Sequence, residues 1–308
     1  MTDFPRSLLE FQRGFPDDAA CAAYLTAARW PDGFVCPACG SLKGWALTTK
    51  AWTHECAACR RQTSVTAGTV LHGSKLPLTV WFWAAYLMAT HSNGISALQL
   101  QKQLGLGSYK SAWLLCAKLR RALVAPGREP LAGLVEVDET AIPCRAKDDP
   151  PTGAGGRSGQ GKLLIAGAVE VRPGGPARIR LAAIEDFSAR SLHAFLATDL
   201  APGATAKTDG WSGYPGAPGV AHEPHVIGPM AAHVVLPWVH RVFANLKTWA
   251  LGVYHGLRRP HLQAYLDEFV FRFNRRRTRH AAFRTLLGVS LALKPATYNM
   301  LIAPEPTV

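Results

Sequence analysis

The sequence lacks any apolar run long enough to cross a membrane. A spanning helix needs about 20 apolar residues, whereas the longest candidate, Leu76–Ala89, is shorter and is soon followed by His91. The opening residues, MTDFPRSLLEFQRGF, also lack the apolar stretch of a secretory signal peptide. We therefore expect a cytoplasmic protein with no membrane partner.

Acidic residues are scarce. Lys and Arg number 34 against 21 Asp and Glu, which gives a formal net charge of +13 over 308 residues. An excess of this size attracts polyanions, because the summed positive potential acts on phosphate over a Debye length. A basic protein without a special partner is the plain alternative.

Cysteines are also few, seven in all. In a reducing compartment this number argues against a disulfide framework and for metal binding or buried thiols. Four of them form two C-x2-C pairs, Cys36 with Cys39 and Cys56 with Cys59. Two such pairs can complete a closed tetrahedral site, so we predict a zinc ribbon with one structural zinc per chain. Reduced or disulfide-linked cysteines in a loop are the alternative, and we expect Cys21, Cys116 and Cys144 to be ordinary thiols.

Two short helices with a glycine turn between them are predicted after the ribbon. The first begins at Ser96 and stops at Gly105, and Ser108 can cap the second, which runs to about Leu123. This arrangement is typical of a helix-turn-helix, whose second helix enters the major groove of DNA. The candidate DNA contacts are Ser108, Tyr109 and Lys110 near its start, and Arg120 and Arg121 further along. The alternative is a helical hairpin with a solvated basic face.

The second half of the sequence predicts a sheet with flanking helices. Leu134–Ile142 alternates like a strand, and three further strands are predicted at Lys162–Val171, Ala177–Ile184 and Ala204–Thr208. A helix capped by Ser188 separates the last two. We expect an α/β ribonuclease-H-like catalytic domain with a mixed sheet, preceded by the zinc ribbon and the helical region.

Two aspartates occupy matching places in this predicted sheet. Asp138 lies inside the first strand, where a carboxylate is costly unless it meets a cation, and Asp209 directly follows the fourth strand. In a ribonuclease-H-like fold these two positions come side by side. Such a pair can hold two Mg2+ or Mn2+ ions that act on phosphate esters. The alternative is that both are solvent-facing residues at strand ends.

Arginines gather near the C-terminus, where no acid occurs between Phe269 and Pro304. A charge run is often only a solvated face. Because these arginines alternate with aromatic residues close to the predicted site, we predict that they contact phosphates. The residues concerned are Arg272, Arg275, Arg276 and Arg277.

Several motifs together resemble the zinc-ribbon transposases of the insertion-sequence 1595 family. They are CPACG and CAACRRQTSVTAGTV in the ribbon, VEVDET and TDGWSGY around the aspartates, and HRVFANLK and YLDEFVFRFNRR in the late helices. The resemblance spans roughly residues 15 to 290. It implies a DDE-type transposase that binds the ends of a mobile element and joins them to target DNA.

The third catalytic residue departs from the common pattern. Many DDE enzymes place Glu seven residues before a Lys; counting back from Lys247 gives His240, and Asn245 lies in the same predicted helix. Asn offers an oxygen, which suits Mg2+ better than a histidine nitrogen. We therefore rank Asn245 first and His240 second, and leave open that neither binds metal. The resemblance also implies that Lys247 is a catalytic residue.

The domain prediction is a helical segment at 1–30, the zinc ribbon at 31–75, the helix-turn-helix at 76–126 and the catalytic domain at 130–300. The expected partner is double-stranded DNA, both element ends and target, bound by a homo-oligomer at the prokaryotic nucleoid. Two alternatives are a ribonuclease-H-like nuclease that cuts without joining, and a zinc-ribbon DNA-binding regulator that has lost catalysis.

Overall fold

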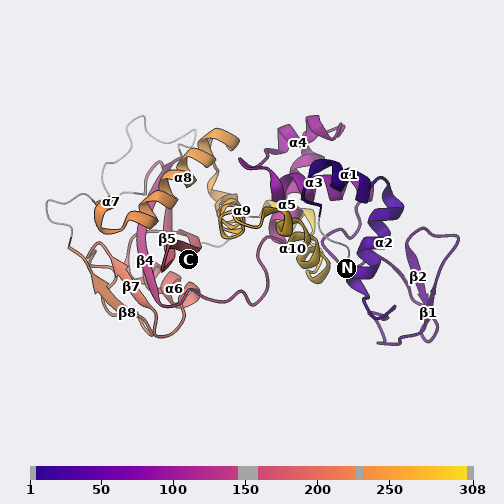
Figure 1. Ribbon diagram of the computed structural model, residues 1–308, viewed down its shortest axis with the longest axis horizontal. Helices are drawn as coiled ribbons and strands as arrows, with labels where there is room; N and C mark the ends of the chain where they lie inside the picture. Colours follow the sequence, from indigo (N-terminus) through magenta and orange to yellow (C-terminus); the bar gives the residue numbers. More distant parts are fainter. Residues whose placement is uncertain (1–4, 145–158, 227–231, 304–308) are drawn as a thin grey trace. The chain divides into compact units, whose positions relative to one another are not determined.

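The computed structural model describes residues 5–144, 159–226 and 232–303. The chain folds into two compact units (Figure 1). The N-terminal unit comprises residues up to Leu123 together with Thr278–Leu301, and the second unit comprises Val124–Arg277 and the last residues from Ile302. None of the described helices is long and apolar enough to cross a membrane.

The N-terminal unit consists of helices and a small antiparallel sheet. Strands β1, β2 and β3 pair in that order. Its elements are α1 (Leu8–Gly14), α2 (Asp18–Arg29), β1 (Gly44–Ala46), β2 (Thr53–Cys56), β3 (Gln62–Ser64), α3 (Leu78–Thr90), α4 (Ala97–Gln103), α5 (Tyr109–Arg121), α10 (Arg279–Ala292) and α11 (Tyr298–Ile302).

Helix α10 returns to this unit from the far end of the sequence. Its Phe283 is 1% exposed, and its ring meets those of Phe11 at 5.5 Å and Tyr86 at 5.8 Å between centroids. The backbone N–H of Val70 also donates to Ser290 O. The sequence-based division placed 278–300 in the catalytic domain; the structure groups them with the N-terminal unit, because the apolar side of α10 is buried there.

The second unit is built on a mixed sheet. Among its described residues the strand order is β6-β5-β4-β7-β8. Strand β5 is antiparallel to both of its neighbours, β4 and β6, whereas β7 and β8 run parallel to β4. Its elements are β4 (Leu134–Pro143), β5 (Lys162–Arg172), β6 (Gly175–Ile184), α6 (Ala189–Asp199), β7 (Thr205–Thr208), β8 (Ala221–Pro224), α7 (Ala232–Val235), α8 (Pro237–Tyr254), η1 (Arg259–His261) and α9 (Leu262–Asn274).

Helices cover both faces of this sheet (Figure 1). One core joins alternate strand residues, such as Ile142 and Ile165, to α8 and α9. The other joins the intervening residues, such as Val135 and Val137, to α6 and Tyr214. Because successive strand residues point to opposite faces, Glu136 and Asp138 lie on the α8 side of β4.

The free edge of β6 is capped by side-chain amides of α9. Asn274 Oδ1 accepts from Ile179 N at 2.8 Å, and Gln263 Oε1 accepts from Ala183 N at 2.9 Å. Amides that satisfy an edge in this way oppose pairing with a second chain.

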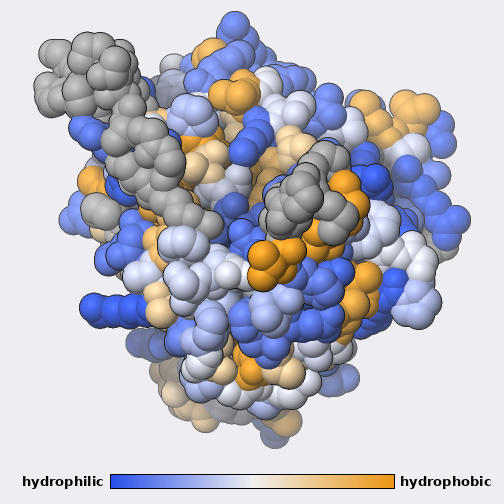
Figure 2. Space-filling model, turned by 90° about the vertical axis from the view of Figure 1, so that its left-hand side faces the viewer, coloured by the Kyte–Doolittle hydropathy of each residue, from blue (hydrophilic) through white to orange (hydrophobic). Residues whose placement is uncertain are grey.

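On the surface in Figure 2, apolar side chains form small separate groups among hydrophilic ones.

Candidate active site and zinc site

Four cysteines of the ribbon converge on one point. The Sγ atoms of Cys36, Cys39, Cys56 and Cys59 all lie within 4.8 Å of one another. Cys36 Sγ is 3.6 Å from Cys59 Sγ, and Cys39 Sγ is 3.6 Å from Cys56 Sγ. Thiolates around zinc, each about 2.3 Å from the ion, stand roughly 3.8 Å apart. The spacing fits a structural zinc site.

Both pairs are presented by matching turns. Gly40 N donates to Cys36 O at 2.9 Å, and Arg60 N donates to Cys56 O at 3.0 Å. Each residue after the second cysteine has a left-handed backbone, with φ of 74° at Gly40 and 60° at Arg60. The backbone N–H of Cys59 lowers the pKa of the Cys56 thiol to about 6, which favours the thiolate that metals bind, whereas the neighbouring thiols of Cys59 and Cys56 raise the pKa of the Cys39 thiol.

The pairing of β4 with β7 runs toward Asp138 and Asp209. In this parallel pair Glu136 faces Lys207, the last pair of the register, and Asp209 directly follows the end of β7 at Thr208. The same register extended by two residues would set Asp138 beside Asp209. Residues paired in this way share a face of the sheet, here the α8 face. Asp138 is 7% exposed.

The loop after β7 holds Asp209 in place. Asp209 Oδ1 accepts the backbone N–H of Trp211 at 3.0 Å, which is an Asx turn. The Thr208 hydroxyl is buried and accepts from Gly210 N at 3.2 Å. Trp211 Nε1 donates to Phe187 O at 3.0 Å, so the TDGW segment is fixed at both ends.

Tyr214, from the same motif, belongs to the core on the α6 side of the sheet. It is fully buried. Desolvation first, and then the charges of Glu139, Asp138 and Asp209, raise the pKa of its phenol well above 10. The charges of all three carboxylates therefore add negative potential at the Tyr214 hydroxyl.

Helix α8 brings His240 to this cluster. His240 Nε2 is 3.3 Å from Asp138 Oδ2. Lys247, seven residues on, is nearly two full turns away and so lies on the same side of α8. Asn245 is exposed, about 140° around the helix from His240. Of the two candidates for the third residue, the structure sets His240 against Asp138 and turns Asn245 to solvent.

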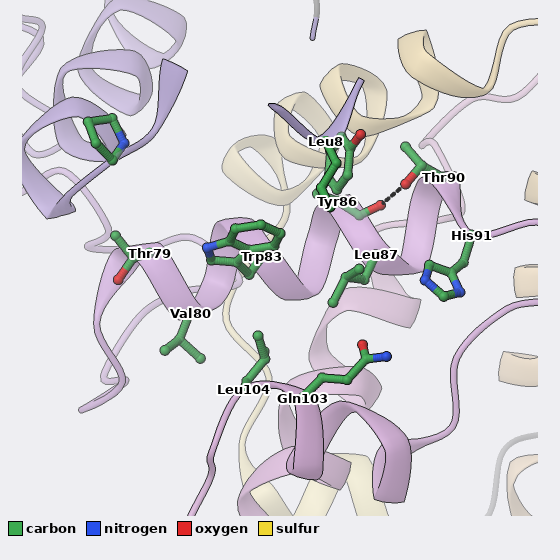
Figure 3. Close-up of a pocket in the computed structure, with 11 residues that line it drawn as sticks. Leu8, Thr79, Val80, Trp83, Tyr86, Leu87, Thr90, His91, Gln103 and Leu104 are labelled. Carbon is green, nitrogen blue, oxygen red and sulfur yellow. Dashed lines mark hydrogen bonds between the residues drawn. The ribbon is translucent and has the colours of Figure 1, made fainter. Parts of the chain in front are cut away.

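The side chains of Asp138, Asp209 and His240 converge less closely than the four cysteines do. Among the described residues, the cysteines are the one group of three or more His, Cys, Asp or Glu side chains whose ligand atoms lie within 4.8 Å of one another. The large apolar groove of Figure 3, of about 810 Å3, lies elsewhere, in the N-terminal unit. Trp83, Leu87 and Leu104 line it, so its chemistry does not suit metal or phosphate.

The predicted DNA contacts on α5 divide by exposure. Ser108 caps the helix through Ser111 N at 3.1 Å, Tyr109 is 53% exposed, and the Lys110 ammonium stacks 4.4 Å from the centre of the Tyr298 ring. Arg121 is exposed. Arg120, in contrast, is 3% exposed. It follows Ala112 and Cys116 at helical spacing on the packed side of α5, so its guanidinium does not face solvent.

The arginines at the end of α9 also divide. Arg276 donates to Ala177 O at 3.1 Å and Phe273 O at 2.9 Å, and to Pro176 O. Arg275 and Arg276 stack on Phe271 and Phe273 at 4.0 and 4.1 Å, while Arg272 is half-buried. Only Arg277 of the four is exposed.

Two profiles of known families match the chain. A transposase zinc-ribbon domain matches residues 16–62, which include the four cysteines, and an ISXO2-like transposase domain matches residues 130–274, which include both aspartates and α8. No curated protein matches the chain. The zinc ribbon and the aspartate-bearing sheet are therefore those of a transposase. The chain belongs to the ISXO2-like transposases of the insertion-sequence 1595 family.

Two residues at this site escaped the sequence prediction. Glu136 is buried and accepts backbone N–H groups from α8, and Gly167 is paired with Asp138 on β5. Glu136 stands two residues before Asp138, between the apolar residues Val135 and Val137. A second carboxylate on the same strand face was the signal that could have marked it. Nothing in the sequence around Gly167 indicates that a helix packs on it.

Proposed function

We propose that this transposase cleaves element ends and joins them to target DNA at Asp138, Asp209 and His240. The sheet supports a ribonuclease-H-like fold: its first strand is central, the first three strands form a meander, and the fourth and fifth run parallel to the first. The observation that carries the proposal is the parallel register of β4 and β7, which leads toward the buried Asp138 on one strand and toward Asp209, just past the end of the other.

The two carboxylates suit divalent cations. A largely buried aspartate beside a second one is costly without a cation, because like charges repel and burial removes water. Bound Mg2+ or Mn2+ would activate the attacking oxygen and stabilise the leaving one. Asp138 and Asp209 would hold the ions. His240, 3.3 Å from Asp138, is the third residue we propose, ahead of Asn245. Lys247, on the same side of α8, is a further catalytic residue that we propose, with DNA rather than metal as its partner.

Helices α4 and α5 are proposed to bind DNA as a helix-turn-helix. Their order, the turn through Gly105 and the solvent-exposed first residues of α5 support this, since the N-terminal residues of a recognition helix meet base edges. The contacts we propose are Ser108, Tyr109 and Lys110, with Arg121 on phosphate. Arg120 is left out because it is buried.

The direct test is cleavage and strand transfer with DNA that carries the element's own ends, in Mg2+ or Mn2+. Asp138→Asn and Asp209→Asn should each abolish both reactions and leave DNA binding intact. Glu223→Gln, a change of an exposed carboxylate on β8, is the matched control and should react normally. Near wild-type cleavage by either aspartate variant would favour the DNA-binding regulator. Cleavage without joining by the unaltered protein would favour the nuclease.

A further inference from the structure

The first turn of α8 is capped by a carboxylate from the strand that carries Asp138. Glu136 Oε2 accepts from Trp238 N at 2.8 Å and from Val239 N at 2.9 Å. The first N–H groups of a helix have no acceptor within it, and the N-cap residue of α8, Leu236, makes no side-chain cap. Glu136, on β4, therefore supplies the hydrogen-bond acceptor that the residues just before α8 do not.

We propose that Glu136 is a positioning residue that sets His240 against Asp138. The inference rests on the proposed function, because it takes His240 as the third residue of the site. Glu136 and Asp138 are two residues apart on one face of β4. His240 directly follows Val239, whose N–H Glu136 binds. Two contacts therefore join β4 to the start of α8: Glu136 binds the N–H groups of Trp238 and Val239, and Asp138 lies next to His240.

Because Glu136 is buried, its carboxylate needs hydrogen-bond donors inside the protein. Glu136 is 4% exposed, and a buried carboxylate is costly unless it is hydrogen-bonded. The N-terminus of a helix offers both N–H donors and the positive end of the helix dipole. The N–H groups of α8 therefore stabilise the Glu136 carboxylate, together with Lys207, which faces it on β7. Helix α8 supplies these groups only when it packs on β4.

Strand β5 also favours the close packing of α8 on the sheet. Gly167 pairs with Asp138 across β4 and β5, and a Cβ added to it would lie 2.4 Å from Phe243 Cε1. Phe243 is one turn beyond His240 on α8. The glycine lets the helix lie close to the sheet just past the histidine, while Glu136 holds it just before.

The first test measures amide hydrogen exchange in the metal-free, full-length protein. Glu136→Met keeps the size of the side chain and removes the acceptor, whereas Glu136→Gln keeps an acceptor oxygen. Glu136→Met should speed exchange at Trp238 and Val239 by about tenfold or more, a typical effect of losing a helix cap. Glu136→Gln should stay close to the unaltered protein.

Glu170→Gln is the matched control. Glu170 is a buried carboxylate on β5, but it pairs with Arg172 and Arg178 rather than with α8. It should not selectively expose the start of α8. If Glu136→Met and Glu136→Gln behave alike, or if neither changes exchange at Trp238 and Val239, the proposal is overturned.

The second test links the cap to the histidine through Mn2+ binding, followed by electron paramagnetic resonance. Glu136→Met should weaken Mn2+ binding several-fold in the unaltered background and add little in a His240→Ala background, because a residue acting through His240 has no effect without it. Equal weakening in both backgrounds would contradict the proposal. Failure of the proposed function has a different signature, namely Mn2+ binding that Asp138→Asn does not change.

Discussion

At the scale of single residues, the zinc site depends on four thiols that two matched turns deliver to one point. Each turn needs a left-handed residue after its second cysteine, at Gly40 and Arg60. Arginine is strained there by roughly 1 kcal/mol, yet Arg60 also pairs with Glu55 at 3.1 Å. This ion pair supports the second turn, and a bound zinc would hold it further through Cys56 and Cys59.

Cys39→Ser should therefore release the metal. We expect about one zinc per chain in the purified protein and close to none in the variant, because three thiolates no longer close the tetrahedron. Elemental analysis gives the answer. Cys144→Ser is the control, since the Cys144 thiol donates to Leu257 O and a hydroxyl can do the same; it should keep its zinc. A folded ribbon without zinc would refute the assignment.

Gly167 offers a second prediction for a single residue. Gly167→Ala forces a methyl group against Phe243 and should cost about 1–3 kcal/mol, as overpacked cores do. Gly252→Ala is the control in α8, because an added Cβ there meets nothing within 4 Å; it should be neutral or stabilising by up to about 1 kcal/mol. Thermal unfolding of both variants makes the comparison, and equal melting temperatures would refute the close fit of α8 on β5.

At the scale of elements, the arginines at the end of α9 have two roles, structural support and DNA contact, which the sequence alone did not separate. Arg276 clamps the β5–β6 turn through backbone carbonyls, while Arg277 faces solvent. Arg277→Ala should weaken binding to all DNA sequences alike and lower the salt slope by about one unit. Arg276→Ala should mainly lower stability. Filter binding across a salt series and thermal unfolding distinguish the two; a sequence-selective loss in Arg277→Ala would contradict phosphate contact.

The strongly patterned elements were predictable from sequence. Strands β4 and β5 begin where their alternation predicts, and Ser108 and Ser188 cap α5 and α6 as expected. Strand β8 was missed because its four residues, AHEP, are mostly exposed and carry no apolar alternation. For the third catalytic residue, ligand chemistry ranked Asn245 first, but the seating of α8 decides which side chain faces the sheet. That seating depends on Glu136, a contact between residues about a hundred positions apart.

At the scale of the whole molecule, the chain passes between the two units three times, after Leu123, after Arg277 and after Leu301. The N-terminal unit is completed only when α10 has been added. Phe283→Ala should cost that unit about 3–5 kcal/mol, a usual range for a buried Phe. Hydrogen exchange should rise in α1, α3 and α10 and stay unchanged in β4 and β5. Loss of protection in the sheet alone would contradict this division.

The central claim is that Asp138, Asp209 and His240 together form the metal site that acts on DNA. Anomalous diffraction from crystals grown with Mn2+ tests it most directly. The account predicts Mn2+ density on the α8 face of the sheet, within bonding distance of both aspartates, with His240 as a ligand or its immediate neighbour. Mn2+ bound elsewhere with the aspartate pair empty, or bound through Asn245 instead of His240, would contradict it.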